Sequence, residues 1–191
     1  GQGHTFAVGA AIAEKFLEAR LGSTMMQHKI YAYISDGGVQ EEISQGAGRI
    51  AGLLKLNNLI MFYDSNEIQL STECDVVMKE DRAKKSQSWG WNVMEIPGND
   101  PDSIRAALVL AQKETERPTL IIGHTTMAKG ALKDDGSSYE HNVKTHGAPL
   151  GGDAYTNTVK HLGGDINDRF VIFDDVKELY AKSIAEIREI V

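Results

Sequence analysis

The sequence predicts an α/β fold in which a mostly parallel sheet lies between two layers of helices, a three-layer α/β/α domain. Short apolar runs of strand length alternate with longer segments of helical periodicity along the first 122 residues, and this order is typical of parallel sheets. The chain has 191 residues, of which 41% are hydrophobic and 25% are charged. That is enough for a substantial core, so we treat residues 1–191 as one domain.

The elements follow one another in a regular order. The first helix is expected over residues 5–20, because apolar side chains recur there at helical spacing and Gly22 follows as a terminator. Asn99-Asp100-Pro101-Asp102 is a start signal for a helix at 102–115. The other expected elements are strands at 30–35, 59–64, 91–96 and 119–122 and helices at 40–55, 79–88 and 175–191.

Two segments lack a clear period. Residues 70–78 have mixed polarity and are expected to form a loop over the site, and residues 125–153 are rich in Gly, Lys, Asp, Ser and Thr. A loop as long as 125–153 is usually functional or disordered. Gly1-Gln2-Gly3 opens directly into a helical pattern without an initiator Met, so we expect the chain to be a segment of a longer protein.

Composition excludes several classes of function. The net charge of −7 argues against nucleic acid as the main partner, and no apolar run approaches the length of a membrane span. Cys74 is the only cysteine, so the sequence has no disulfide framework and no cysteine metal cage. A reducing, cytoplasmic setting is the default expectation.

Asp36 and Asn66 are the most informative pair of residues. Each follows a short apolar run, and one helical segment lies between the two runs. A strand–helix–strand unit places both strand ends at the same edge of a parallel sheet. Carboxylate and amide oxygens suit Mg²⁺ or Ca²⁺, and Mg²⁺ usually completes its shell with phosphate oxygens of a ligand. We therefore predict an exposed metal site that holds a phosphorylated cofactor, and expect Asp36→Ala to abolish cofactor binding without affecting the fold.

Other residues near these positions have two interpretations each. Gly37 and Gly38 allow backbone N–H groups to approach a phosphate, but Ser35-Asp36-Gly37-Gly38 is also typical of a tight turn with an Asp cap. Glu41 lies in the first turn of the expected helix, where it could face a pocket or a partner subunit or only interact with the helix dipole. His146 could donate to a phosphate or a substrate hydroxyl, whereas an isolated loop histidine often has no role.

Several stretches in the same order resemble transketolase. Ser35-Asp36-Gly37 followed by Asn66 is similar to the motif of thiamine-diphosphate enzymes, which begins Gly-Asp-Gly and ends in Asn. The more specific stretches cover nearly all of the chain: Gly1-Gln2-Gly3, Ala10-Ala11-Ile12-Ala13-Glu14-Lys15, Phe62-Tyr63-Asp64-Ser65-Asn66 with Ile68, Trp89-Gly90-Trp91, and His146-Gly147-Ala148-Pro149-Leu150-Gly151.

The resemblance implies the diphosphate-binding domain of a transketolase, cut before Gly1 and without the pyrimidine-binding and C-terminal domains. It implies Mg²⁺ ligands, roles in cofactor and substrate binding, and a role in subunit coupling. The Mg²⁺ ligands would be the side chains of Asp36 and Asn66 and the backbone carbonyl of Ile68. Gly37 N–H would contact the diphosphate, Leu70 would pack near the thiazolium, His146 would contact diphosphate and sugar, and Glu41 would help to couple two subunits.

The implied activity is transfer of a two-carbon ketol unit from a ketose phosphate to an aldose phosphate by a homodimer, in the pentose phosphate pathway. The segment alone would be inactive, because the resemblance places the activating Glu and several substrate histidines outside it. Three alternatives stay open at this point: another thiamine enzyme such as deoxyxylulose-phosphate synthase or a 2-oxo acid dehydrogenase component, a half-length subunit or non-catalytic module, and a generic nucleotide-binding domain.

Overall fold

The computed structural model describes residues 1–190. The chain divides into two units, and the first comprises residues 1–129 and 140–148. This first unit contains a sheet of four parallel strands. The strands lie in the order β1-β2-β4-β3 and every neighbouring pair is parallel. The expected parallel α/β fold is confirmed. The bounds of the strands are β1 (Ile30–Ser35), β2 (Leu59–Ser65), β3 (Asn92–Pro97) and β4 (Thr119–His124).

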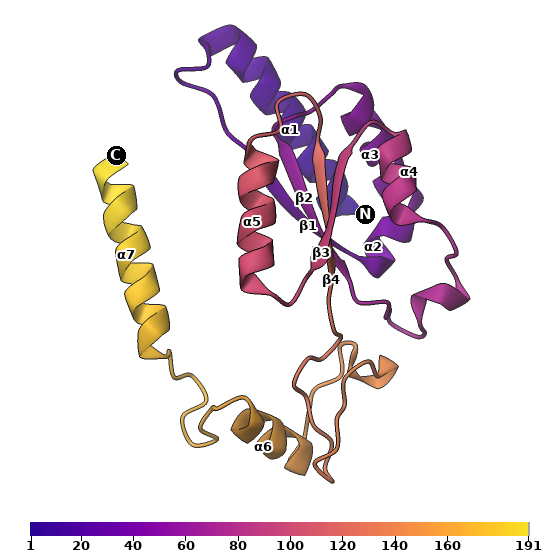
Figure 1. The fold of residues 1–191 in the computed structure, drawn as a ribbon, viewed down its shortest axis with the longest axis vertical. Coiled ribbons are helices and arrows are strands. Elements are labelled where there is room, and N and C mark those ends of the chain that lie inside the picture. Colours follow the sequence, from indigo (N-terminus) through magenta and orange to yellow (C-terminus); the bar gives the residue numbers. More distant parts are fainter. Residues whose placement is uncertain (191) are drawn as a thin grey trace. The chain divides into compact units, whose positions relative to one another are not determined.

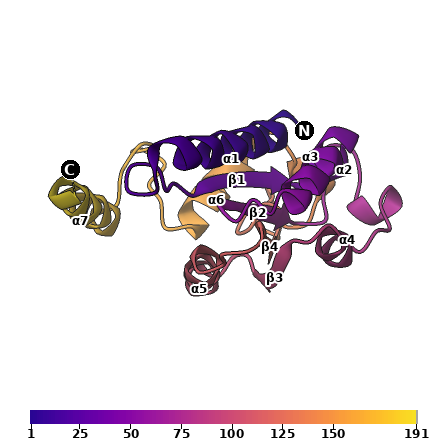
Figure 2. The same cartoon turned by 90° about the horizontal axis from the view of Figure 1, so that it is seen from above.

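Helices cover both faces of this sheet, as Figures 1 and 2 show. Odd-numbered residues of β2, such as Leu59 and Met61, face a cluster that includes α1, α3 and the tryptophan Trp91. Even-numbered Ile60 belongs to a second cluster formed with α5. The helices of this unit are α1 (Gln2–Leu21), α2 (Asp36–Gln40), α3 (Glu42–Leu53), α4 (Arg82–Ser88) and α5 (Pro101–Gln112).

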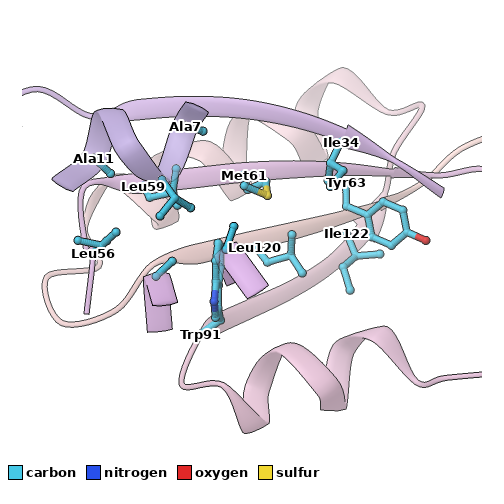
Figure 3. Close-up of a cluster of buried hydrophobic side chains, with 13 residues drawn as sticks. Ala7, Ala11, Ile34, Leu56, Leu59, Met61, Tyr63, Trp91, Leu120 and Ile122 are labelled. Carbon is cyan, nitrogen blue, oxygen red and sulfur yellow. The ribbon is translucent and has the colours of Figure 1, made fainter. Parts of the chain in front are cut away.

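The larger cluster packs closely around the two tryptophans. Trp91 is 3% exposed, and its indole N–H donates to the carbonyl of Gly48 at 2.8 Å. Gly52, one turn further along α3, lies against the backbone of Trp89. Figure 3 shows Leu59, Met61 and Tyr63 along one strand, with the Tyr63 hydroxyl pointing away from the cluster at the strand end. Tyr63 therefore connects the hydrophobic core, which its ring contacts, with the candidate site, which its hydroxyl reaches.

The helix expected at 40–55 is divided in two and starts earlier. Helix α2 begins at Asp36, directly after β1, and Glu41 interrupts the helix with an extended backbone, φ −69° and ψ 132°. Helix α3 then begins at Glu42. At the start of α2, two backbone N–H groups at the end of β2 donate to the Asp36 carboxylate and tie the first residue of this helix to the neighbouring strand.

Residues 130–139 and 149–190 form the second unit, which contains α6 (Gly152–His161) and α7 (Asp174–Ile190). The Leu132 N–H donates to Thr158 Oγ1 at 2.9 Å, and the Ala154 N–H donates to Asp134 Oδ1 at 2.8 Å. Helix α6 was not predicted, although its amphipathic pattern is similar to that of α7. Helix α7 confirms the helix expected at 175–191, except that Val191 lies outside the described residues. Within the described residues, the first unit also contains two short 3₁₀ segments, η1 (Cys74–Val76) and η2 (Val143–Thr145).

Among the described residues, no helix combines the length and the hydrophobicity that crossing a bilayer requires.

Candidate functional site

Asp36 and Asn66 meet at one rim of the sheet. In the register of β1 and β2, Ser35 lies beside Asp64, so the residues that follow leave the sheet together. Asp36 Oδ2 accepts hydrogen bonds from the backbone N–H groups of Asn66 and Glu67, both at 2.9 Å. The expected convergence of the two strand ends is therefore present.

The expectation that Asp36 is exposed is wrong. Asp36 is 1% exposed and Asn66 is 7% exposed. A buried carboxylate is costly unless it is paired and hydrogen-bonded, and the surrounding residues meet that requirement. Asp36 is consequently a structural anchor as well as a candidate ligand.

The second oxygen of Asp36 accepts from two side chains. The Tyr63 hydroxyl donates to Oδ1, and Arg82 Nη1 donates to the same atom at 3.1 Å. The other nitrogen of the guanidinium, Nη2, donates to both carboxylate oxygens of Glu67 at 2.9 and 3.1 Å. Arg82 thus bridges two carboxylates at the rim, and it reaches this position from the start of α4.

Burial and negative charge keep two neighbouring groups protonated. Burial raises the pKa of Tyr63, and the hydrogen bond to Asp36 and its charge raise it further. Burial also raises the pKa of the Cys74 thiol to about 12, with the charges of Asp36 and Glu67 adding to the effect. Tyr63 is therefore a hydrogen-bond donor to Asp36, and Cys74 is a neutral thiol at physiological pH.

The chemistry of this rim fits a cation. A cationic guanidinium already lies on Asp36, 3.1 Å from the carboxylate oxygen. Ligand atoms of Asp36, Glu67 and Cys74 all lie within 4.8 Å of one another. The Asn66 amide oxygen accepts from the Ile68 N–H at 3.0 Å, and Ile68 is 4% exposed. Carboxylate, amide and backbone oxygens are the ligands of hard divalent ions, so Asp36, Asn66 and Ile68 are suited to Mg²⁺, whereas the neutral Cys74 thiol is not a ligand for this ion.

Within the part of the chain that the structure describes, the other predicted site residues make no hydrogen bond with Asp36 or Asn66, and most of them are exposed. Gly37 is exposed at the start of α2, with open space where a side chain would begin. Glu41 is exposed at the break between α2 and α3, and the amino group of Gly1 pairs with it at 2.7 Å. Leu70 is 76% exposed. His146 follows η2 and takes no part in the described hydrogen bonds around Asp36; its Nδ1 is enclosed without a hydrogen-bond partner.

Sequence reasoning missed four residues at this site: Tyr63, Glu67, Cys74 and Arg82. The alternation of strand residues places Tyr63 on the buried face of β2, which was a usable signal. Arg82 lies 46 residues after Asp36, in a charged segment read only as helix-forming. No local pattern links Asp36 and Arg82, so the contact between them depends on the tertiary fold.

Comparison with known proteins gives consistent results. The family model described as transketolase, thiamine diphosphate binding domain, matches residues 1–191. The chain is 40% identical over 167 residues to transketolase 1 of Vibrio cholerae, covering 85% of this chain and 24% of that protein. It is 36% identical over 195 residues to transketolase 1 of Candida albicans, covering 100% of this chain and 28% of that protein.

Solved structures agree with these relatives. The transketolase of Campylobacter jejuni superposes with a TM-score of 0.87 at 39% identity, over 94% of this chain and 28% of that one. A Pichia stipitis transketolase mutant in complex with fructose 6-phosphate gives a TM-score of 0.91 at 30% identity, over 100% of this chain and 28% of that one. The chain therefore spans about a quarter of the length of the proteins it matches.

Proposed function

This chain belongs to the family of transketolase thiamine diphosphate binding domains, and on that premise we propose that it holds the diphosphate of the cofactor through a Mg²⁺ ion. Asp36 and Asn66 bind the ion through side-chain oxygens and Ile68 binds it through its backbone carbonyl, with Ca²⁺ as a possible substitute. One observation carries the proposal: a buried carboxylate at the meeting point of two strand ends already binds a cation.

The remaining site residues position the cofactor and the sugar. Gly37 offers its backbone N–H to the diphosphate, supported by the open space beside it. The exposed Leu70 packs near the thiazolium, and His146 donates to the diphosphate and the substrate. Bound thiamine diphosphate supplies a stabilised carbanion, and the residues of this chain supply its binding and orientation.

The longer protein transfers a two-carbon ketol unit between sugar phosphates in the pentose phosphate pathway. The Pichia stipitis structure with fructose 6-phosphate supports a sugar phosphate as the substrate class. The 191-residue segment by itself is inactive, since it corresponds to about a quarter of its relatives. Clear turnover of xylulose 5-phosphate with ribose 5-phosphate by the purified segment would refute this part.

A second copy of the protein completes the active site as a homodimer, with Glu41 near the subunit boundary. Large apolar side chains exposed on two adjacent helices support an interface: Phe6 and Phe16 on α1 and Leu53 on α3 are 77%, 59% and 80% exposed. Sedimentation that finds only monomer at high concentration would count against the dimer. The cytoplasmic setting and the lack of a nucleic-acid partner stay predictions from composition.

Calorimetric titration with thiamine diphosphate, with and without Mg²⁺, tests the ion site. The wild-type chain is expected to bind only when Mg²⁺ is present. Asp36→Asn keeps the shape of the side chain but removes its charge, so it should lose Mg²⁺-dependent binding. Asp75→Asn is the matched control, since Asp75 is an exposed carboxylate on the nearby η1 segment whose side chain is 69% exposed. Equal affinity in Asp36→Asn and wild type would refute the assignment.

A further inference from the structure

Every hydrogen-bonding position on the Asp36 carboxylate is taken. A carboxylate offers about four lone-pair sites, and four donors use them: the N–H groups of Asn66 and Glu67 on Oδ2, and Tyr63 and Arg82 on Oδ1. A divalent ion can bind this carboxylate only if one of these donors leaves.

Arg82 is the donor that can leave. The two N–H groups belong to the backbone at the end of β2, and Tyr63 is 0% exposed inside the core. The Arg82 side chain is 24% exposed and reaches Asp36 from the first residue of α4. A guanidinium on a long stem can change its rotamer without moving the backbone.

The structure also offers a place for the displaced side chain. Arg82 lines a cavity of about 270 Å³ whose walls include Glu80, Asp81 and Glu95. Each of these carboxylates already contacts a basic side chain: Glu80 contacts Lys85, Asp81 contacts Lys84 at 2.8 Å, and Glu95 contacts His124 at 2.9 Å. A displaced guanidinium would share these acidic groups with their present partners, so the cavity gives Arg82 an acidic position away from Asp36.

We propose that Arg82 is an internal competitor for the divalent ion, so that the ion binds Asp36 only by displacing the guanidinium into the neighbouring cavity. This inference rests on the proposed ion site. It assigns Arg82 as the residue that sets the ion concentration needed for thiamine diphosphate binding. The same contact stabilises the chain without cofactor, because it neutralises a buried carboxylate.

Mn²⁺ is a suitable probe, because electron paramagnetic resonance measures free Mn²⁺ directly. We would titrate the wild type, Arg82→Met and Arg105→Gln with Mn²⁺ at saturating thiamine diphosphate. Arg82→Met keeps the aliphatic stem and removes the charge. It should bind Mn²⁺ at least about tenfold more tightly, because the hydrogen bonds from Arg82 Nη1 to Asp36 at 3.1 Å and to the Tyr63 hydroxyl at 2.8 Å no longer have to be given up.

Arg105→Gln is the control for net charge. Arg105 lies on α5 outside the cavity that Arg82 lines, its side chain is 69% exposed, and its guanidinium pairs with Asp102 at 3.0 Å. It should change Mn²⁺ affinity by less than about twofold, as expected for a solvent-screened surface charge. Arg82→Lys keeps the charge but loses the planar fork that bridges Asp36 and Glu67, so its affinity should lie between wild type and Arg82→Met.

Thermal unfolding gives a second readout. Without ion and cofactor, Arg82→Met should melt below the wild type, and the addition of Mn²⁺ with thiamine diphosphate should raise its melting temperature by more than it raises that of the wild type. A purely structural role for Arg82 would lower both melting temperatures equally.

The outcomes separate this inference from the proposed function. If the wild type binds Mn²⁺ and Arg82→Met binds it equally or more weakly, the competition is overturned and the ion site stands. If neither protein binds Mn²⁺, the ion site itself fails and the competition fails with it.

Discussion

Replacing Asp36 by Ala should cost about 3–5 kcal/mol of folding stability, even without any metal or cofactor. The substitution removes the acceptor for four donors. Glu67 is exposed and the Arg82 side chain is 24% exposed, so water can replace part of what these two donors lose. The Tyr63 hydroxyl and the Asn66 N–H are buried, and each buried donor left unpaired costs about 1–3 kcal/mol.

Two further considerations lead to the same range. Removing one partner of a buried ion pair usually costs about 3–5 kcal/mol, and Arg82 would keep its charge at the rim with only Glu67 to neutralise it. Total stabilities of single domains are about 5–15 kcal/mol. The variant should therefore unfold at a much lower denaturant concentration.

Urea unfolding followed by the fluorescence of Trp89 and Trp91 measures this loss. Trp91 is 3% exposed, so its emission reports on the core. Asp75→Ala serves as the control, since Asp75 is an exposed carboxylate with only a 4.0 Å ion pair to Lys79, and it should change stability by less than about 0.5 kcal/mol. A loss below about 1 kcal/mol for Asp36→Ala, with an unchanged denaturant slope, would refute the structural role of this carboxylate.

Three further predictions concern other parts of the first unit. A Cβ at Gly52 would overlap the Trp89 carbonyl, whereas a Cβ at Gly46 on the same helix would meet open space. Measured by urea unfolding, Gly52→Ala should therefore lower the free energy of unfolding by at least about 2 kcal/mol. Gly46→Ala should raise it by about 0.5–1 kcal/mol. Equal effects of the two substitutions would contradict this packing. Burial, with the nearby N-terminal ammonium, lowers the pKa of His4 from 6.5 to about 4. Below pH 6.5 the unfolded chain therefore binds a proton that the folded chain does not. The contribution of His4 to the free energy of unfolding should therefore fall by about 1–3 kcal/mol from pH 6.5 to pH 4 and stay level above pH 6.5. His4→Leu should remove this fall, and a pH profile of stability unchanged by the substitution would contradict the burial of a neutral His4. Cys74 is 1% exposed and its pKa is raised to about 12, so its thiol should react with a maleimide at pH 8 at least about thirtyfold more slowly in the folded chain than after unfolding. Comparable rates in the two states would show that the thiol is accessible and ionisable.

The sequence determined much of the fold because its signals are local. The β1, β2 and β4 segments are short apolar runs, and Gly22 and Asp100-Pro101 mark the end of α1 and the start of α5. The pairing of Asp36 with Asn66 was also predictable, because a single strand–helix–strand unit brings consecutive strand ends to one rim. Helix α6 was missed although its amphipathic pattern is similar to that of α7. In the structure, its contacts with residues 132 and 134 hold this largely polar segment in place.

By itself, the sequence determined which residues carry side-chain oxygens at the strand ends and on which rim of the sheet they gather. Only the tertiary structure decided that the Asp36 carboxylate is buried and that Arg82 neutralises it. The physical reason is that burial depends on what packs over a position, and charge pairing depends on distance in space. Asp36 and Arg82 are 46 residues apart, so their ion pair exists only because α4 folds back against the end of the strands.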